Sequence, residues 1–186
     1  MKTIPTAVPG IIIEPRVFPD ARGFFFESYH AERYERAGLP ARFVQDNYSR
    51  SAAGILRGLH YQLRRPQAKL VRVPHGTIFD VAVDIRRGAP TFGRWVGVEL
   101  SAANKRQLFV PAGFAHGLCV TSEESEVEYK CTDYYAVDDE HGVPWNDPFI
   151  GIASPVSQPF LSDKDLAFQP LPPNRADLPS YNGAGV

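Results

Sequence analysis

Short apolar segments recur along the whole chain and are separated by turns rich in glycine and proline. In most of them apolar and polar residues alternate, as expected for strands that bury one face. Strands are predicted at residues 11–17, 24–28, 43–48, 58–62, 69–73, 76–85, 95–100, 106–110, 117–120 and 124–135. Short strands at this spacing are typical of a β-sandwich or barrel. The pattern therefore predicts an all-β fold.

Helical signals are few. One helix is predicted at residues 31–37, because Gly38 and Pro40 follow it as a helix stop. The segment Leu-Ser-Asp-Lys-Asp after Phe160 predicts a short turn or helix, followed by an extended end. A length of 186 residues with 44% hydrophobic residues suffices to close one core. We expect residues 1–186 to form a single domain.

Strand alternation assigns candidate polar residues to the interior. Tyr129 shares one face of the predicted strand 124–135 with Val127, Cys131, Asp133 and Tyr135. Lys69 shares a face with Val71 and Val73. A cation is rarely placed on an apolar face without a partner, and a bound anion or a developing negative charge would serve as one.

The segment 58–62 adds a histidine. Gly58, His60 and Gln62 lie on one face of this strand, with Leu59 and Tyr61 on the other. If these interior faces line the same barrel, His60 converges with the lysine and the tyrosine.

Such a group suits the abstraction of a proton next to a carbonyl. His60 is the expected base, Lys69 would stabilise the enolate oxygen, and Tyr129 would return a proton from the opposite face. A base histidine also needs a carboxylate that fixes its tautomer, and the chain offers too many acids to choose one. Each of these residues, taken singly, also has an ordinary structural interpretation. His60 could be a hydrogen-bonded histidine of the barrel, Lys69 could be one half of an ion pair, and Tyr129 could pack in the core.

A metal centre is not predicted. Pro111-x-Gly113-x-x-His116 resembles the second motif of cupin jelly rolls, where the histidine is often a metal ligand. The stretch that corresponds to the first motif reads His60-Tyr61-Gln62 instead of His-x-His. One imidazole and one amide make a poor site for a transition metal, so we expect neither a metal nor another cofactor. Cys119 and Cys131 lack CxxC spacing and are expected to be buried free thiols.

Charge and hydropathy exclude other partners. The formal net charge is −1, and no basic run could neutralise a row of phosphates, so a nucleic acid is not expected. No window approaches the roughly 20 apolar residues of a membrane span. The N-terminal residues contain no apolar stretch typical of a secretory signal, which predicts a cytoplasmic protein.

Ordered motifs along nearly the whole chain carry a family resemblance. They are Asp20-Ala-Arg-Gly-Phe-Phe-Phe-Glu27, Phe43-Val-Gln-Asp-Asn47, Leu56-Arg-Gly-Leu-His-Tyr-Gln62, Gln67-Ala-Lys-Leu-Val-Arg72, Gly113-Phe-Ala-His116, Tyr129-Lys-Cys-Thr-Asp-Tyr-Tyr135 and Leu161-Ser-Asp-Lys-Asp165. The sequence resembles the dTDP-4-dehydrorhamnose 3,5-epimerase family. The resemblance implies a cupin-type jelly-roll barrel with a few short helices, a homodimer, and a dTDP-4-keto-6-deoxy sugar substrate.

The resemblance also implies roles for individual residues. Asp165 would pair with His60, a partner that only the family motif supplies. Lys69 and Tyr129 keep the roles given above. The implied substrate-binding residues are Arg22, Phe24, Glu27, Gln45, Asn47, Arg57, His116 and Tyr135. The segment 22–27 would cross to the neighbouring subunit, and guanidinium groups suit phosphate oxygens.

Other functions compete with the 3,5-epimerase. The same four catalytic residues would serve an epimerase that inverts only C3 or only C5. A non-catalytic nucleotide-sugar-binding cupin would need the cations but neither a base nor an acid. A metal-dependent cupin oxygenase or isomerase ranks last, because the His-x-His motif is missing.

Overall fold

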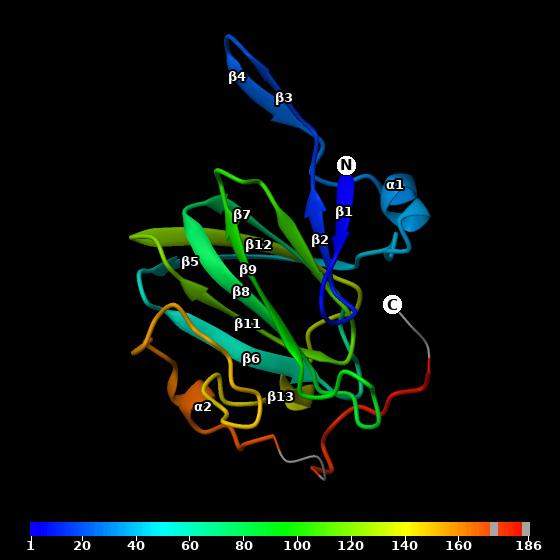
Figure 1. The fold of residues 1–186 in the computed structure, drawn as a ribbon, viewed down its shortest axis with the longest axis vertical. Helices are drawn as coiled ribbons and strands as arrows, with labels where there is room; N and C mark the ends of the chain where they lie inside the picture. The colour runs from blue at the N-terminus through cyan, green and yellow to red at the C-terminus, as the bar shows by residue number, and fades with distance from the viewer. Residues whose placement is uncertain (172–174, 184–186) are drawn as a thin grey trace.

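The computed structural model describes residues 1–171 and 175–183, and most of the strands form two facing antiparallel sheets (Figure 1). The larger sheet runs in the order β1 (Lys2–Pro5), β2 (Ile11–Glu14), β10 (Gln107–Val110), β7 (Lys69–His75), β12 (Glu124–Cys131) and β5 (Gln45–Ala52). The smaller sheet runs in the order β13 (Glu140–Gly142), β6 (Leu56–Gln62), β11 (Phe114–Val120), β8 (Thr77–Asp84) and β9 (Trp95–Ser101). The predicted all-β jelly roll is confirmed.

A separate hairpin extends away from the two sheets (Figure 1). It consists of β3 (Val17–Asp20) and β4 (Gly23–Phe26), and its Phe25 is 70% exposed. Helical structure is limited to α1 (Ala31–Arg36), the single 3₁₀ turn Val137–Asp139 and α2 (Asp163–Leu166) among the described residues. The helix predicted at 31–37 and the short helix predicted in the tail are both present.

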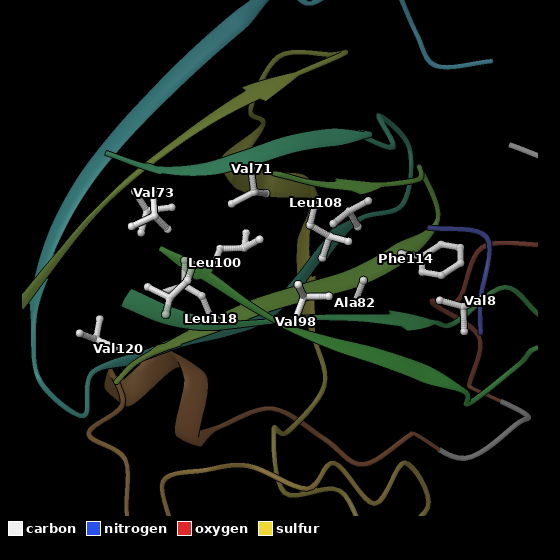
Figure 2. Packing of buried hydrophobic residues seen from close by; sticks show 13 residues of the cluster. Val8, Val71, Val73, Ala82, Val98, Leu100, Leu108, Phe114, Leu118 and Val120 are labelled. Carbon is white, nitrogen blue, oxygen red and sulfur yellow. The ribbon is translucent and has the colours of Figure 1, made fainter. Parts of the chain in front are cut away.

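The main core fills the space between the sheets (Figure 2). Val71 and Leu108 reach it from the larger sheet, and Val98 and Leu118 from the smaller one. Because side chains alternate along a strand, the neighbours of these core residues point to the outer faces of the sheets. On the outer face of the smaller sheet they pack against Leu171 and other apolar residues of the C-terminal segment. Each fully buried aliphatic side chain contributes about 1.5–3 kcal/mol, so the sandwich is a rigid frame for what it encloses.

Several strand boundaries differ from the sequence pattern, and β1 and β13 were not predicted. Two of the differences are larger than the others. The strand predicted at 11–17 is divided into β2 and β3, and Pro15, which lacks an N–H for the ladder, lies between them. The strand predicted at 124–135 ends at Cys131. The expectation that Asp133 and Tyr135 continue the face of Tyr129 is therefore wrong. Side chains take over the backbone groups there, since Gln67 Nε2 donates to Asp133 O (2.8 Å).

Two further observations concern expectations from composition. Cys119 and Cys131 are buried free thiols, as predicted. No helix within residues 1–171 and 175–183 has the length and hydropathy to cross a membrane.

Candidate active site

A cavity of about 760 Å³ is enclosed largely by side chains from both sheets. Every predicted catalytic residue lines it. His60 comes from β6, Lys69 from β7, Tyr129 from β12 and Asp165 from α2. The convergence predicted from strand alternation is thus present, because β7 and β12 are neighbours in one sheet and β6 lies in the other.

His60 and Asp165 form a hydrogen-bonded pair. His60 Nε2 lies 2.7 Å from Asp165 Oδ1, and the N–H of Gly58 donates to Asp165 Oδ2 (3.3 Å). Burial acts to raise the pKa of Asp165, but its hydrogen bond to His60 and the charge of that ring outweigh burial, so the pKa is lowered. With the carboxylate ionised, Nε2 carries the proton of the neutral ring. Nδ1 is then the basic nitrogen.

The Asp165 carboxylate is fixed by the start of α2. Ser162 caps this short helix, and its side chain accepts a hydrogen bond from the N–H of Asp165 (3.2 Å). Only 5% of Asp165 is exposed. The edge of the His60 ring packs against Phe168, with ring centroids 5.6 Å apart. These contacts leave the imidazole little freedom to turn.

Lys69 and Tyr129 face the cavity from adjacent strands. The Lys69 ammonium lies 5.8 Å from the centroid of the Tyr129 ring. Burial lowers the pKa of Lys69 and raises the pKa of Tyr129. Burial thus keeps the tyrosine hydroxyl protonated at neutral pH, which is the form that can donate a proton.

Glu140 is a cavity residue that the sequence pattern did not indicate. Its Oε1 lies 3.7 Å from His60 Nδ1 and 2.8 Å from Lys164 Nζ, and its Oε2 accepts a hydrogen bond from the Tyr135 hydroxyl (2.6 Å). Burial acts to raise the pKa of Glu140, but its bonds to Lys164 and Tyr135 outweigh burial and lower it. The bond to Glu140 raises the pKa of Tyr135 to about 12.

Comparison with known protein families identifies the family of this chain. A family model described as dTDP-4-dehydrorhamnose 3,5-epimerase matches residues 5–172. The chain belongs to the dTDP-4-dehydrorhamnose 3,5-epimerase family.

Relatives agree closely in sequence and fold. The dTDP-4-dehydrorhamnose 3,5-epimerase of Pseudomonas aeruginosa is 58% identical over 168 residues, which cover 89% of this chain and 93% of the relative. The dTDP-6-deoxy-D-glucose-3,5-epimerase of Legionella pneumophila, solved with dTDP-4-keto-L-rhamnose, has a TM-score of 0.93 and 51% identity, over 97% of this chain and 98% of its own.

A third relative bears on the alternative of a single-centre enzyme. A 3′-monoepimerase from Streptomyces bikiniensis, solved with dTDP-quinovose, has a TM-score of 0.87 and 33% identity, over 95% of this chain and 92% of its own. The fold of the 3,5-epimerase family is therefore shared by a relative named for one centre.

Most of the binding residues that the family resemblance implies also line the cavity. They are Gln45, Asn47, Arg57, His116 and Tyr135. Gln45 Nε2 donates to Asn47 Oδ1 (2.9 Å), and Arg57 Nε donates to Ser51 Oγ (3.0 Å).

The hairpin residues lie elsewhere. Arg22, Phe24 and Glu27 are absent from the cavity lining. Arg22 forms an ion pair with Asp20 (2.7 Å), and Glu27 forms one with Arg33 (2.8 Å). Phe24 is 58% exposed. These three residues therefore do not reach the cavity of their own chain.

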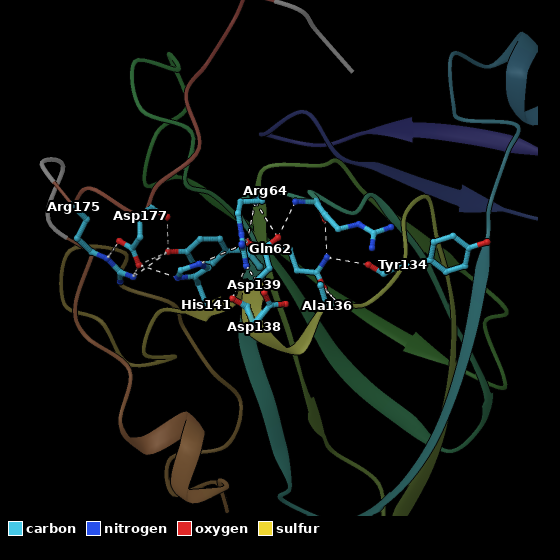
Figure 3. Close-up of polar contacts among 11 residues, drawn as sticks. Gln62, Arg64, Tyr134, Ala136, Asp138, Asp139, His141, Arg175 and Asp177 are labelled. Atoms are coloured by element: carbon cyan, nitrogen blue, oxygen red, sulfur yellow. Dashed lines mark hydrogen bonds and ion pairs between the residues drawn. The ribbon is translucent and has the colours of Figure 1, made fainter.

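Gln62 contributes to the cavity by holding a loop (Figure 3). Its Nε2 donates to the carbonyls of Arg65 (2.7 Å) and Tyr134 (3.2 Å), while its Oε1 accepts from the N–H of Ala136 (2.8 Å). Arg65 lies in the loop between β6 and β7, and Tyr134 and Ala136 lie in the loop that leads from β12 to β13. The buried amide thus sets the position of the segment that carries Tyr135 and Glu140.

Metal ligands do not gather in the described part of the chain. Within residues 1–171 and 175–183, no group of three or more His, Cys, Asp and Glu side chains is arranged to hold a metal ion.

Proposed function

We propose that this chain is a dTDP-4-dehydrorhamnose 3,5-epimerase, which converts dTDP-4-dehydro-6-deoxy-D-glucose to dTDP-4-dehydro-L-rhamnose. One observation carries the proposal: a His60–Asp165 pair shares a cavity with Lys69 and Tyr129, which are both partly buried. Family membership and the product bound to the Legionella relative support the choice of substrate. The cytoplasmic location expected from the sequence is part of the same proposal.

The reaction begins with removal of a proton next to the sugar's C4 carbonyl. This carbonyl acidifies the C–H bonds at both C3 and C5, so one site can act on each centre in turn. His60 Nδ1 takes the proton, and Asp165 stabilises the imidazolium that results. The electron pair of the C–H bond moves onto the C4 oxygen. The Lys69 ammonium stabilises this enolate in the interior, where electrostatic interactions are strong.

Inversion requires a proton from the opposite face of the ring. Tyr129 donates its hydroxyl proton to the same carbon, the C4 carbonyl re-forms, and tyrosinate is left. The raised pKa of Tyr129 supports this role, because the hydroxyl stays protonated until the enolate forms. Solvent then reprotonates the tyrosinate and takes the proton from His60. A second cycle inverts the other centre.

The active form is proposed to be a homodimer. Arg22, Phe24 and Glu27 do not reach their own cavity, and they lie on a hairpin that extends from the sandwich (Figure 1). Crossing to a second subunit would bring the guanidinium of Arg22 to the substrate's phosphates and cover the exposed aromatic rings.

Mixed dimers test this arrangement. His60→Ala and Arg22→Ala proteins are each expected to be weakly active. In a heterodimer, one site would then carry both changes and the other neither. After random subunit exchange of equal amounts, activity should rise to about a quarter of the wild-type value. Mixtures that stay as inactive as the separate variants would exclude a shared site.

Proton NMR of the wild-type protein with the 4-keto substrate in D₂O tests the activity itself. Deuterium is expected at both C3 and C5, together with formation of the rhamno product. Exchange at one carbon alone would assign the chain to the single-centre class, which the Streptomyces bikiniensis relative represents. Binding without exchange at either carbon would support a non-catalytic nucleotide-sugar-binding protein.

A further inference from the structure

Asp80 is a buried carboxylate that the reaction described above does not use. It lies on β8 between Ile78 and Ala82, whose side chains belong to the core between the sheets, so strand alternation points Asp80 inward as well. None of its surface is exposed. Its Oδ1 lies 2.8 Å from His116 Nε2.

The second oxygen of Asp80 lacks a partner. Among the described residues, Asp80 Oδ2 is the one buried side-chain nitrogen or oxygen without a hydrogen bond. A buried carboxylate is costly unless its charge is compensated, so this position calls for a nearby cation.

Lys69 lies on β7 in the other sheet, and the inner faces of β7 and β8 pack into the same core. It shares the inner face of β7 with Val71 and Val73, which belong to the same core cluster as Ile78. Within the described residues, no carboxylate lies within 4.0 Å of its ammonium. Burial lowers the pKa of Lys69, and the groups that oppose burial are Cys131, Asp80 and Glu140.

Two of these three groups are poor counter-charges for Lys69. Burial raises the pKa of the Cys131 thiol, which keeps it neutral. Glu140 is already bonded to Lys164 and Tyr135. Asp80 is the carboxylate with an unused oxygen. The titratable groups around the lysine are Cys131 and Tyr129 on β12, Asp80 on β8, His116 on β11, His60 on β6 and Glu140 on β13.

We propose that Asp80 is a positioning residue of the active site. One of its oxygens orients the His116 imidazole, and the negative charge on the other keeps the Lys69 ammonium protonated in the cavity. Asp80 does not line the cavity, whereas His116 and Lys69 do. With Nε2–H donating to Asp80, His116 presents Nδ1 as an acceptor for a substrate hydroxyl. The kinetic consequences of this arrangement rest on the proposed function, but the charge state of Lys69 does not.

Competitive labelling of lysines with fluorodinitrobenzene between pH 6 and pH 11, read by peptide mass spectrometry, measures the titration of Lys69 without turnover. The exposed Lys2 serves as a reference. In the wild-type protein we expect Lys69 to be protonated, and therefore unreactive, at neutral pH. A wild-type midpoint below pH 7 would overturn the proposal, whatever the variants do.

The Asp80→Asn variant removes the charge and keeps the shape. It should lower the Lys69 midpoint by about one pH unit or more, because one nearby negative charge is lost. The matched control is Asp165→Asn, which removes the carboxylate of the other His–Asp pair and should leave the Lys69 midpoint in place. A folded Asp80→Asn protein with an unchanged midpoint would overturn the proposal.

The pH dependence of kcat gives a second readout. Since only protonated Lys69 stabilises the enolate, the alkaline limb of the profile should move to lower pH in Asp80→Asn, with kcat affected more than KM. A uniform loss across all pH values would indicate a merely structural role and contradict the proposal. A shifted Lys69 midpoint in a protein that never turns over the dTDP sugar would uphold the inference and refute the proposed function instead.

Discussion

Replacing Asp165 by asparagine should leave the cavity intact but place the ring proton of His60, the proposed base, on the wrong nitrogen. The Gly58 N–H needs an acceptor at 3.3 Å, so the asparagine carbonyl should turn toward it. The amide nitrogen would then donate to His60 Nε2, which lies 2.7 Å from the carboxylate in the wild type. The ring proton moves to Nδ1, the nitrogen that has to accept the substrate's proton.

The size of the effect follows from the contacts that are lost. A hydrogen bond to a charged group contributes about 1.5–3 kcal/mol, and forcing the productive tautomer would leave a buried N–H facing another donor at a cost of about 1–3 kcal/mol. Together these terms amount to roughly 2.5–6 kcal/mol, which corresponds to a loss in kcat of about 10²- to 10⁴-fold. KM should change little, because Asp165 is only 5% exposed.

Initial rates of deuterium incorporation, followed by NMR in D₂O at saturating substrate, measure this loss. Asp163→Asn is the matched control, since Asp163 starts the same short helix but is exposed. It should retain nearly the wild-type rate. A folded Asp165→Asn enzyme whose kcat stays within about threefold of the wild type would refute the assignment of Asp165 as the group that orients the base.

Three other outcomes are expected. Tyr129→Phe should slow product formation by about 10²- to 10⁴-fold, while hydrogen exchange on the face of the base persists. Replacing the exposed Tyr48 by phenylalanine is its control. An equal loss of product formation and of exchange would argue against Tyr129 as the acid. Gln62→Leu leaves backbone groups of two loops without partners, so urea unfolding should show a loss of about 1–3 kcal/mol, against a smaller loss for Gln67→Leu. Burial acts to raise the pKa of Asp165, but the bond to the base outweighs it, so the folded state favours the ionised form. Its contribution to stability is full above the unfolded pKa of about 3.9 and is lost as pH falls through the lower folded value. The difference in unfolding free energy between wild type and Asp165→Asn should be constant above about pH 5 and shrink below about pH 4; a difference that does not change with pH would contradict the lowered pKa.

Alternation along single strands predicted the part of the site that regular strands carry. His60 and Tyr129 lie inside strands and Lys69 is the first residue of one, so the side-chain direction of each follows from its position. Their convergence in one cavity followed from the two-sheet architecture. The same rule failed beyond Cys131, where hydrogen bonds from Gln62 and Gln67 replace the ladder and the period of two no longer applies.

The alternation of apolar and polar residues could not predict site residues that lie outside the regular strands. Asp165 reaches His60 from a tail helix more than a hundred positions away, and only the family motif pointed to it. Glu140 lies on a strand of three residues, too short to show any alternation. Asp80 Oδ2 lacks a hydrogen-bond partner because of which groups the tertiary structure places around it, and a linear pattern does not encode those groups.

A crystal structure of the protein with dTDP-D-glucose, which lacks the 4-keto group and cannot react, tests the central claim most directly. We expect the sugar in the cavity between His60 and Tyr129, with His60 Nδ1 about 3–3.5 Å from the carbon to be deprotonated and the tyrosine hydroxyl on the opposite face of the ring. A sugar bound with both groups on the same face, or outside the cavity, would contradict inversion by this base and acid.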